Sequence, residues 1–324
     1  AIHLGIVSLL RTSMPAYSRP AGSSGSGSSI LSENSTLNPN PCACCDDTEP
    51  VPFDVQGHIV ALEECFPGAV PEPVLIDSMI SVLGKHGFNA ATSINLVSNC
   101  RDELCRPFTE YLDAKWTSPS FNISSLAGMV FCGRTGFGAA MAHSPVDANG
   151  MERYVFWVAP HIALSGDNTI GKVMRPGRAQ PSTACGALLA VLGEIQNSRL
   201  DVNLNSTDIE MSLIKQRVMS YLQYGHQPSL NELTYAVHEC ILDDVRTTAE
   251  ATVDLGKCEY VIISGIQVHA SMGRTFFWPG SMCKYSSKGV EDLYTEYNEK
   301  IGAWRASEAS SLVFADQDLS NLFE

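Results

Sequence analysis

The sequence predicts an α/β domain with a mainly parallel central sheet flanked by helices. Short apolar runs alternate with longer segments in which apolar residues recur every three or four positions. The short runs are almost continuously apolar, which is typical of strands buried on both faces of a parallel sheet. Strands and helices that alternate along a chain build such sheets.

The individual elements follow from these two periodicities and from their end signals. The strands that we expect span 91–99, 126–132, 153–159, 259–266 and 274–278. The helices that we expect span 73–88, 101–116, 181–197, 208–222, 229–251 and 290–304. Pro181 and Ser182 mark one helix start, and Ser229 with Glu232 forms a capping box for another. The glycine-rich segment 133–138 is expected to form a tight turn.

The first 51 residues have a different composition from the rest. Residues 1–32 contain no Asp or Glu, and they carry a Gly/Ser run. Such a segment is typical of an organellar transit peptide, although an expression linker joined to a natural tail also fits. We therefore expect a disordered leader at 1–51 and one domain at 52–324, within which 206–251 could form a helical subdomain.

Charge and cysteine content narrow the class of partner. The formal net charge is −14, from 35 acidic and 21 basic side chains. This balance argues against nucleic acid or an anionic membrane as the main partner, because both attract cationic surfaces. No run of eighteen apolar residues is present, so we expect no membrane span. The 11 Cys are expected to be reduced thiols in an intracellular compartment, some of them metal ligands.

Three residues carry the strongest chemical signal, Cys100, His161 and Cys185. Cys100 and His161 are expected at the carboxyl ends of strands, where open parallel sheets form their sites. Cys185 is expected at the start of a helix, which favours a thiolate. Two thiolates and one imidazole fill three positions of a tetrahedral zinc site, and a fourth position open to water is typical of catalytic zinc.

Each of these residues also has a structural interpretation. A lone Cys more often packs in a core than performs chemistry. Cys105, just over one helical turn from Cys100, is the best substitute ligand if Cys185 does not contribute. Asp102, two residues after Cys100, could simply cap the following helix.

Four segments together resemble the limiting-CO2-inducible protein B (LCIB) family, the theta-class carbonic anhydrases, which is similar to the beta-class carbonic anhydrases. The segments are Asn99-Cys100-Arg101-Asp102-Glu103-Leu104, Phe131-Cys132-Gly133-Arg134-Thr135-Gly136, Ala159-Pro160-His161-Ile162, and Arg175-Pro176-Gly177-Arg178 through Pro181-Ser182-Thr183-Ala184-Cys185-Gly186. The resemblance implies a beta-carbonic-anhydrase-like fold. It also implies that Cys100, His161 and Cys185 bind Zn2+, with the catalytic residue Asp102 beside the metal.

The chain departs from the beta-class pattern at two places. Leu104 stands where that pattern, Cys-x-Asp-x-Arg, has an arginine. We expect Arg101 to replace it as the partner of Asp102, and thus as the second catalytic residue, with Arg106 as the second choice. The His-x-x-Cys spacing is opened by the insertion 162–184.

The resemblance implies zinc-dependent reversible hydration of CO2 to bicarbonate in an algal CO2-concentrating mechanism. One alternative is an inactive zinc-binding member that acts as a structural or assembly partner. Another is a cysteine hydrolase with Cys185 as nucleophile and His161 as base. The resemblance further implies a homodimer or a hetero-complex with a family paralogue. Together with the leader, it suggests a chloroplast location, in the stroma or at the pyrenoid periphery.

Overall fold

The computed structural model describes residues 55–175, 177–223, 225–270 and 273–314, all within one compact unit, Pro52–Glu324. The leader expected at 1–51 therefore lies outside the described residues. Among the described helices, none combines the length and apolar composition that crossing a bilayer requires.

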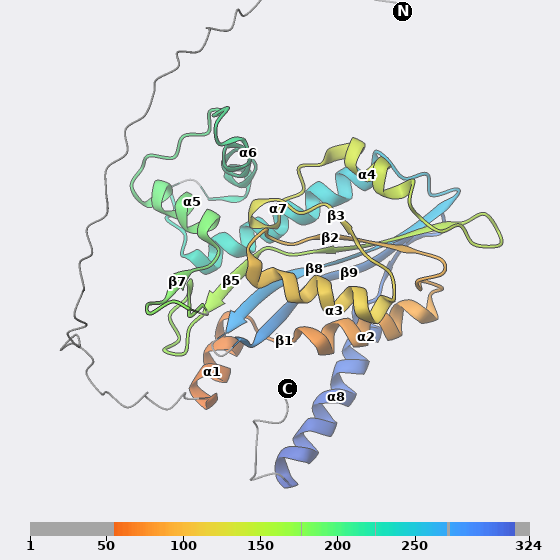
Figure 1. The fold of residues 1–324 in the computed structure, drawn as a ribbon, viewed down its shortest axis with the longest axis horizontal. Helices are drawn as coiled ribbons and strands as arrows, with labels where there is room; N and C mark the ends of the chain where they lie inside the picture. The colour runs from red at the N-terminus through yellow and green to blue at the C-terminus, as the bar shows by residue number, and fades with distance from the viewer. Residues whose placement is uncertain (1–54, 176, 224, 271–272, 315–324) are drawn as a thin grey trace, which may run out of the picture. The chain divides into compact units, whose positions relative to one another are not determined.

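A single large sheet runs through the unit, with strand order β1-β9-β8-β4-β2-β3 (Figure 1). Its strands are β1 Val70–Pro71, β2 Ile94–Ser98, β3 Phe121–Asn122, β4 Glu152–Val158, β5 His161–Leu164, β8 Cys258–Ala270, β9 Thr275–Ser286 and β10 Gly289–Asp292. The pairs β2/β3, β2/β4, β4/β8 and β5/β8 are parallel, whereas β9 is antiparallel to β8, β1 and β10. The mainly parallel sheet predicted from the apolar runs is confirmed.

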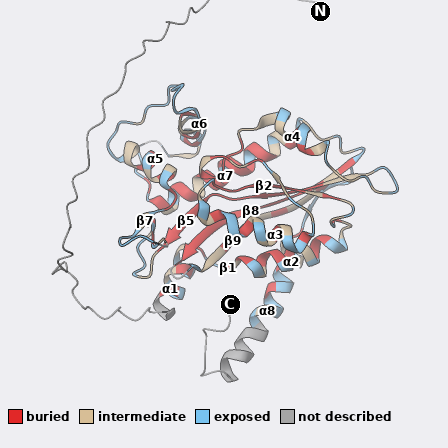
Figure 2. Cartoon of the chain, viewed as in Figure 1, coloured by how far each residue is buried: buried red, intermediate tan, exposed pale blue. Residues whose placement is uncertain are grey.

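Helices cover both faces of this sheet, because alternate residues of its inner strands point to opposite sides. The helices are α1 Val55–Cys65, α2 Glu72–Lys85, α3 Arg106–Trp116, α4 Gly133–Met141, α5 Gly186–Gln196, α6 Ile209–Val218, α7 Leu230–Glu250 and α8 Tyr294–Phe314. On β4, Tyr154 and Phe156 join one core with α4, α5 and α7, while Val155 and Trp157 join another with α2, α3 and α8. Figure 2 shows the buried strands between the helices.

The helix α7 begins where the capping box predicted. Ser229 Oγ accepts a hydrogen bond from the backbone N–H of Glu232, and the Glu232 carboxylate accepts one from the backbone N–H of Ser229. Leu233, Val237 and Ile241 then recur on the face of α7 that packs in the core. The apolar stripe and the cap agree here, so the sequence alone was sufficient.

The predicted strand 126–132 is wrong. The segment instead forms a short 3-10 helix, Leu126–Gly128, and then a loop that crosses the end of β2. Ser98 Oγ donates to the carbonyls of Gly128 and Met129 and thereby holds the loop at the strand end. Gly128 has φ +76°, and a Cβ there would lie 2.2 Å from the carbonyl oxygen of Ala159.

Two other predictions need correction near this loop. The glycine-rich segment 133–138 belongs to the helix α4 rather than to a turn, because Phe137 and Ala140 are buried on one helical face. The helix predicted at 181–197 begins only at Gly186. The residues before it form β7, Ser182–Thr183, which pairs with β6, Lys172–Val173, in a small hairpin. The described residues of the insertion 162–184 thus include a paired hairpin that belongs to the domain.

Gly128 offers a test of this arrangement. We expect Gly128→Ala to lower the free energy of unfolding by about 2–4 kcal/mol, because the added methyl group overlaps the Ala159 backbone and the positive φ disfavours any side chain. The matched control is Gly138→Ala in the exposed face of α4, where a Cβ meets nothing within 4 Å. That change should stabilise by about 0.5–1 kcal/mol. Urea unfolding measures both, and equal effects of the two would contradict the close approach.

Candidate metal centre

Cys100, His161 and Cys185 meet at one point in the structure. One ligand atom from each residue lies within 4.8 Å of the others, and all three side chains are buried. The parallel strands β2 and β4 end side by side, which places Cys100 two residues beyond β2 next to the start of β5, where His161 stands. Cys185 is the N-cap residue of α5. The structure therefore brings together all three residues expected to bind metal.

The spacing of the two sulfurs suits a tetrahedral ion. The Sγ atoms of Cys100 and Cys185 lie 3.8 Å apart. Zinc–sulfur bonds of about 2.3 Å at tetrahedral angles separate two sulfurs by about the same distance. Neither ring nitrogen of the fully buried His161 has a hydrogen-bond partner among the described residues. Buried imidazole nitrogens without partners are costly unless another group satisfies them, so the donor set fits zinc.

Ionisation of one thiol of this pair opposes ionisation of the other. Contact with Cys185 lowers the pKa of Cys100 to about 4 against the effect of burial, and His161 adds to the lowering. The same contact, together with burial, raises the pKa of Cys185 well above its ordinary value, although the first turn of α5 favours its thiolate. One negative charge is therefore favoured at the pair and a second is opposed. Two thiolates at this distance require a cation between them.

Asp102 lies beside this donor set. Its Oδ2 is 3.9 Å from Nε2 of His161. Its Oδ1 also accepts a hydrogen bond from the backbone N–H of Leu104, at the start of a 3-10 turn, Glu103–Cys105. The helix-cap interpretation and the site interpretation of Asp102 are thus compatible, because one carboxylate serves both.

The prediction that Arg101 or Arg106 pairs with Asp102 is wrong. Arg101 points outward, where its Nη2 lies 2.7 Å from Glu210 on α6. Arg106 lies on the exposed face of α3 and pairs with Glu110 four residues later. The Arg101 side chain is 58% exposed, so it lies on the solvent side of this segment, whereas Asp102 is turned inward.

Arg175 holds Asp102 instead. Its Nη1 donates to Oδ1 at 2.9 Å and its Nη2 donates to Oδ2 at 2.7 Å, a bidentate ion pair. Arg175 comes from the hairpin inserted between His161 and Cys185, where its Nε donates to Ser182 and its Nη2 also donates to the carbonyl of Thr183. The sequence carried one weak signal for Arg175. Residues two apart on a strand point to the same face, so Arg175 is expected on the same side as the apolar residue Val173, which is buried.

The ion pair fixes the charge of Asp102. Burial alone would raise the pKa of Asp102, but the hydrogen bonds from Arg175 and the charge interaction with the nearby His161 outweigh it and hold the pKa at about 2. The carboxylate consequently stays ionised at neutral pH.

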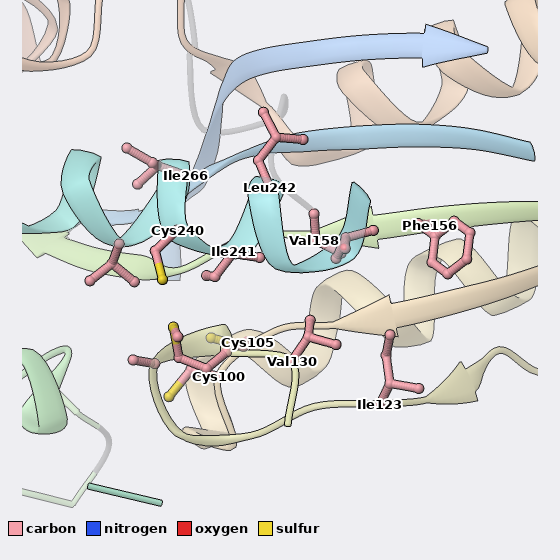
Figure 3. Close-up of a cluster of buried hydrophobic side chains, with 14 of the residues drawn as sticks. Cys100, Cys105, Ile123, Val130, Phe156, Val158, Cys240, Ile241, Leu242 and Ile266 are labelled. Atoms are coloured by element: carbon pink, nitrogen blue, oxygen red, sulfur yellow. The ribbon is translucent and has the colours of Figure 1, made fainter. Parts of the chain in front are cut away.

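A second group of donors also includes His161. Cys105 and His269 each place a ligand atom within 4.8 Å of His161 and of each other, and both are buried. Cys105 Sγ lies 3.6 Å from His269 Nε2. Cys105 also belongs, with Cys100, to the buried cluster below α7 (Figure 3). The sequence singled out Cys105 as a substitute ligand but gave no reason to choose His269, which β8 brings here.

Known proteins provide an independent comparison. Residues 69–286 match the family of limiting CO2-inducible proteins B/C beta carbonic anhydrases. A crystal structure of LCIB superposes with a TM-score of 0.60 at 26% identity, covering 71% of this chain and 96% of that one. PtLCIB4, a homologue of LCIB, superposes with a TM-score of 0.64 at 22% identity, covering 72% and 98%. No curated protein sequence matches the chain.

The pH dependence of the free energy of unfolding can test which arginine pairs with Asp102. Because the folded-state pKa of Asp102 lies below its unfolded value, the pair's contribution to stability is complete above about pH 4 and is lost as pH falls through about 2. Arg175→Gln removes the largest effect that opposes burial, so the pKa of Asp102 should rise. The variant should lose about 3 kcal/mol at pH 7, near the lower end for broken buried pairs. Part of that loss should return at pH 5, where the carboxyl can protonate.

The matched controls are Arg101→Gln and Arg106→Gln, whose arginines are mostly exposed. Each should change the free energy of unfolding by less than about 1 kcal/mol at either pH. Urea unfolding of the three variants at pH 5 and pH 7 makes the measurement. A larger loss for Arg101→Gln than for Arg175→Gln would contradict the assignment.

Proposed function

Because the chain belongs to the limiting CO2-inducible protein B/C family of beta carbonic anhydrases, we propose that it is a zinc enzyme that reversibly hydrates CO2 to bicarbonate. Cys100, His161 and Cys185 would hold the zinc. The observation that carries the proposal is the convergence of these three donors from separate segments, with an ionised carboxylate beside them. A structural zinc site would be expected to close with a fourth protein ligand.

Zinc bound by these residues would supply a Lewis acid that brings the pKa of a water ligand to about 7, as in the three-histidine carbonic anhydrases. Asp102 is the acceptor that the chain places beside this position. It accepts a hydrogen bond from the reacting water and turns the oxygen lone pair toward CO2. A carboxylate with a pKa of about 2 accepts this bond throughout the neutral range without itself removing the proton.

Arg175 acts through Asp102 and is a positioning residue. With both carboxylate oxygens occupied by its guanidinium, Asp102 is held as an acceptor instead of turning to become a fourth ligand. The pair itself is largely buried, with 15% and 13% of the two side chains exposed, which strengthens the interaction.

The hydrolase alternative has little support. Cys185 is 1% exposed, and its pKa is raised by Cys100 and burial, so its thiol is a poor nucleophile. An inactive family member remains the second candidate, because the same donors would bind zinc in an assembly protein. Subunit pairing and plastid targeting stay predictions.

Two substitutions test the catalytic proposal. Cys185→Ser should lose most of the bound zinc and with it CO2 hydration, because a serine hydroxyl is a poor zinc ligand. Asp102→Asn should keep zinc yet lower kcat by about 10²–10³, because the amide keeps the shape of the carboxylate but not its charge. Stopped-flow CO2 hydration and metal analysis measure both. The matched control is Cys65→Ser, a half-buried thiol of α1 that should change neither quantity.

The outcomes separate the candidates. Stoichiometric zinc without CO2 hydration in the unaltered protein would favour the assembly role. Zinc that stays in Cys185→Ser, or unchanged kcat in Asp102→Asn, would reject the site as assigned.

A further inference from the structure

Two sets of soft donors share His161. The outer set consists of Cys100, Cys185 and His161, and the inner set consists of Cys105, His269 and His161. Cys105 and His269, the two members of the inner set that the outer set does not share, play no part in the proposed hydration of CO2. Every side chain in the inner set is at most 2% exposed, so it cannot be a surface cluster of unrelated groups.

The contact between Cys105 and His269, which serves as a hydrogen bond when no ion is bound, also has the length that two ligands of one ion require. Sulfur and nitrogen ligands at about 2.3 and 2.0 Å from one ion lie about 3.5 Å apart, and Cys105 Sγ lies 3.6 Å from His269 Nε2. Both ring nitrogens of His161 and Nδ1 of His269 have no hydrogen-bond partner among the described residues. The rings of His161 and His269 meet edge to face, with centroids 5.1 Å apart.

Charge decides which ion each set fits. In a buried site, an ion is held best when its ligands neutralise it, because uncompensated charge in a low dielectric is costly. The two thiolates of the outer set neutralise a divalent ion. Asp102 is paired with Arg175, which also contacts the solvent-exposed Glu103. The single thiolate of the inner set, with two neutral imidazoles, neutralises a monovalent ion.

We propose that the inner set, Cys105, His161 and His269, is a binding site for a soft monovalent ion, Cu+. Thiolate and imidazole ligands suit copper, and two His with one Cys is the trigonal set of copper sites. Binding exchanges Cu+ for the thiol proton of Cys105, which passes to solvent, so the net charge of the buried site does not change. No electron transfer is involved.

Sharing His161 makes the two sites competitive. A neutral imidazole has one lone pair, so His161 serves either the outer ion or the inner ion. Occupation by Cu+ therefore removes the only nitrogen donor of the outer set and weakens its hold on zinc. Copper would then inhibit the proposed reaction, because it competes with zinc for the ligand His161.

The experiment uses the full chain with Cys42, Cys44 and Cys45 replaced by Ser, because that thiol group could bind Cu+ by itself. The reduced, metal-free protein is titrated without oxygen with Cu+ held by a competing chromophoric chelator. We expect one Cu+ per chain, with one sulfur and two nitrogen neighbours by copper-edge X-ray absorption. His269→Gln should weaken this binding about 100-fold or more, beyond the loss seen for partners outside the ligand shell. Cys105→Ser should do the same.

The matched control is Cys258→Ser, another buried thiol, which should leave Cu+ affinity unchanged. Zinc binding by each variant reports the outer set separately, and zinc retained in His269→Gln shows that the variant is folded. If that variant is unfolded, Cys105→Ser decides. Added to zinc-loaded protein, one equivalent of Cu+ should release zinc.

Three results would overturn the proposal. One is equal Cu+ affinity in the inner-set variants and the parent. Another is two sulfur neighbours around copper, which would place it at Cys100 and Cys185. The third is full retention of zinc alongside bound Cu+. None of these depends on CO2 hydration, so failure here is distinct from failure of the proposed function.

Discussion

Two sulfurs 3.8 Å apart in a core sheltered from water set the main constraint on this molecule. Negative charge at that spacing cannot accumulate without a compensating cation. The surroundings are arranged accordingly. The start of α5 meets one sulfur, His161 lies beside the pair, and the carboxylate of Asp102 next to His161 is paired with Arg175. The negative charges of the two thiolates and of Asp102 thus each require a positive partner, and this requirement determines which ion the site can hold.

The insertion between His161 and Cys185 becomes intelligible in this light. A short loop would bring the two ligands together but would supply no cation for Asp102. Arg175 lies in the segment that connects β6 with β7, and its guanidinium binds Asp102 in the segment that follows β2. The inserted segment thus provides Arg175 as the partner of Asp102, the role that the beta-class pattern gives to an arginine at the position of Leu104.

The sequence was informative where local rules and burial agree. Apolar runs located β2, β4 and β8, the capping box located α7, and the strand ends placed Cys100 near His161. The predictions from sequence failed where contacts between distant segments determine the local structure. Nothing local shows that Gly128 must fit against Ala159, so a buried loop looked like a strand. Arg175 and His269 reach the site from 73 and 167 residues beyond Asp102, and only the fold reveals their distance from it.

The wide spacing of the three outer donors has a consequence for the polymer as a whole. His161 follows Cys100 by 61 positions and precedes Cys185 by 24. An ion that ties them acts as a covalent staple does, since each closed loop removes configurational entropy from the unfolded chain, worth up to about 3–4 kcal/mol. Metal supply would then govern, besides the proposed activity, how much of the folded protein survives heat and proteolysis.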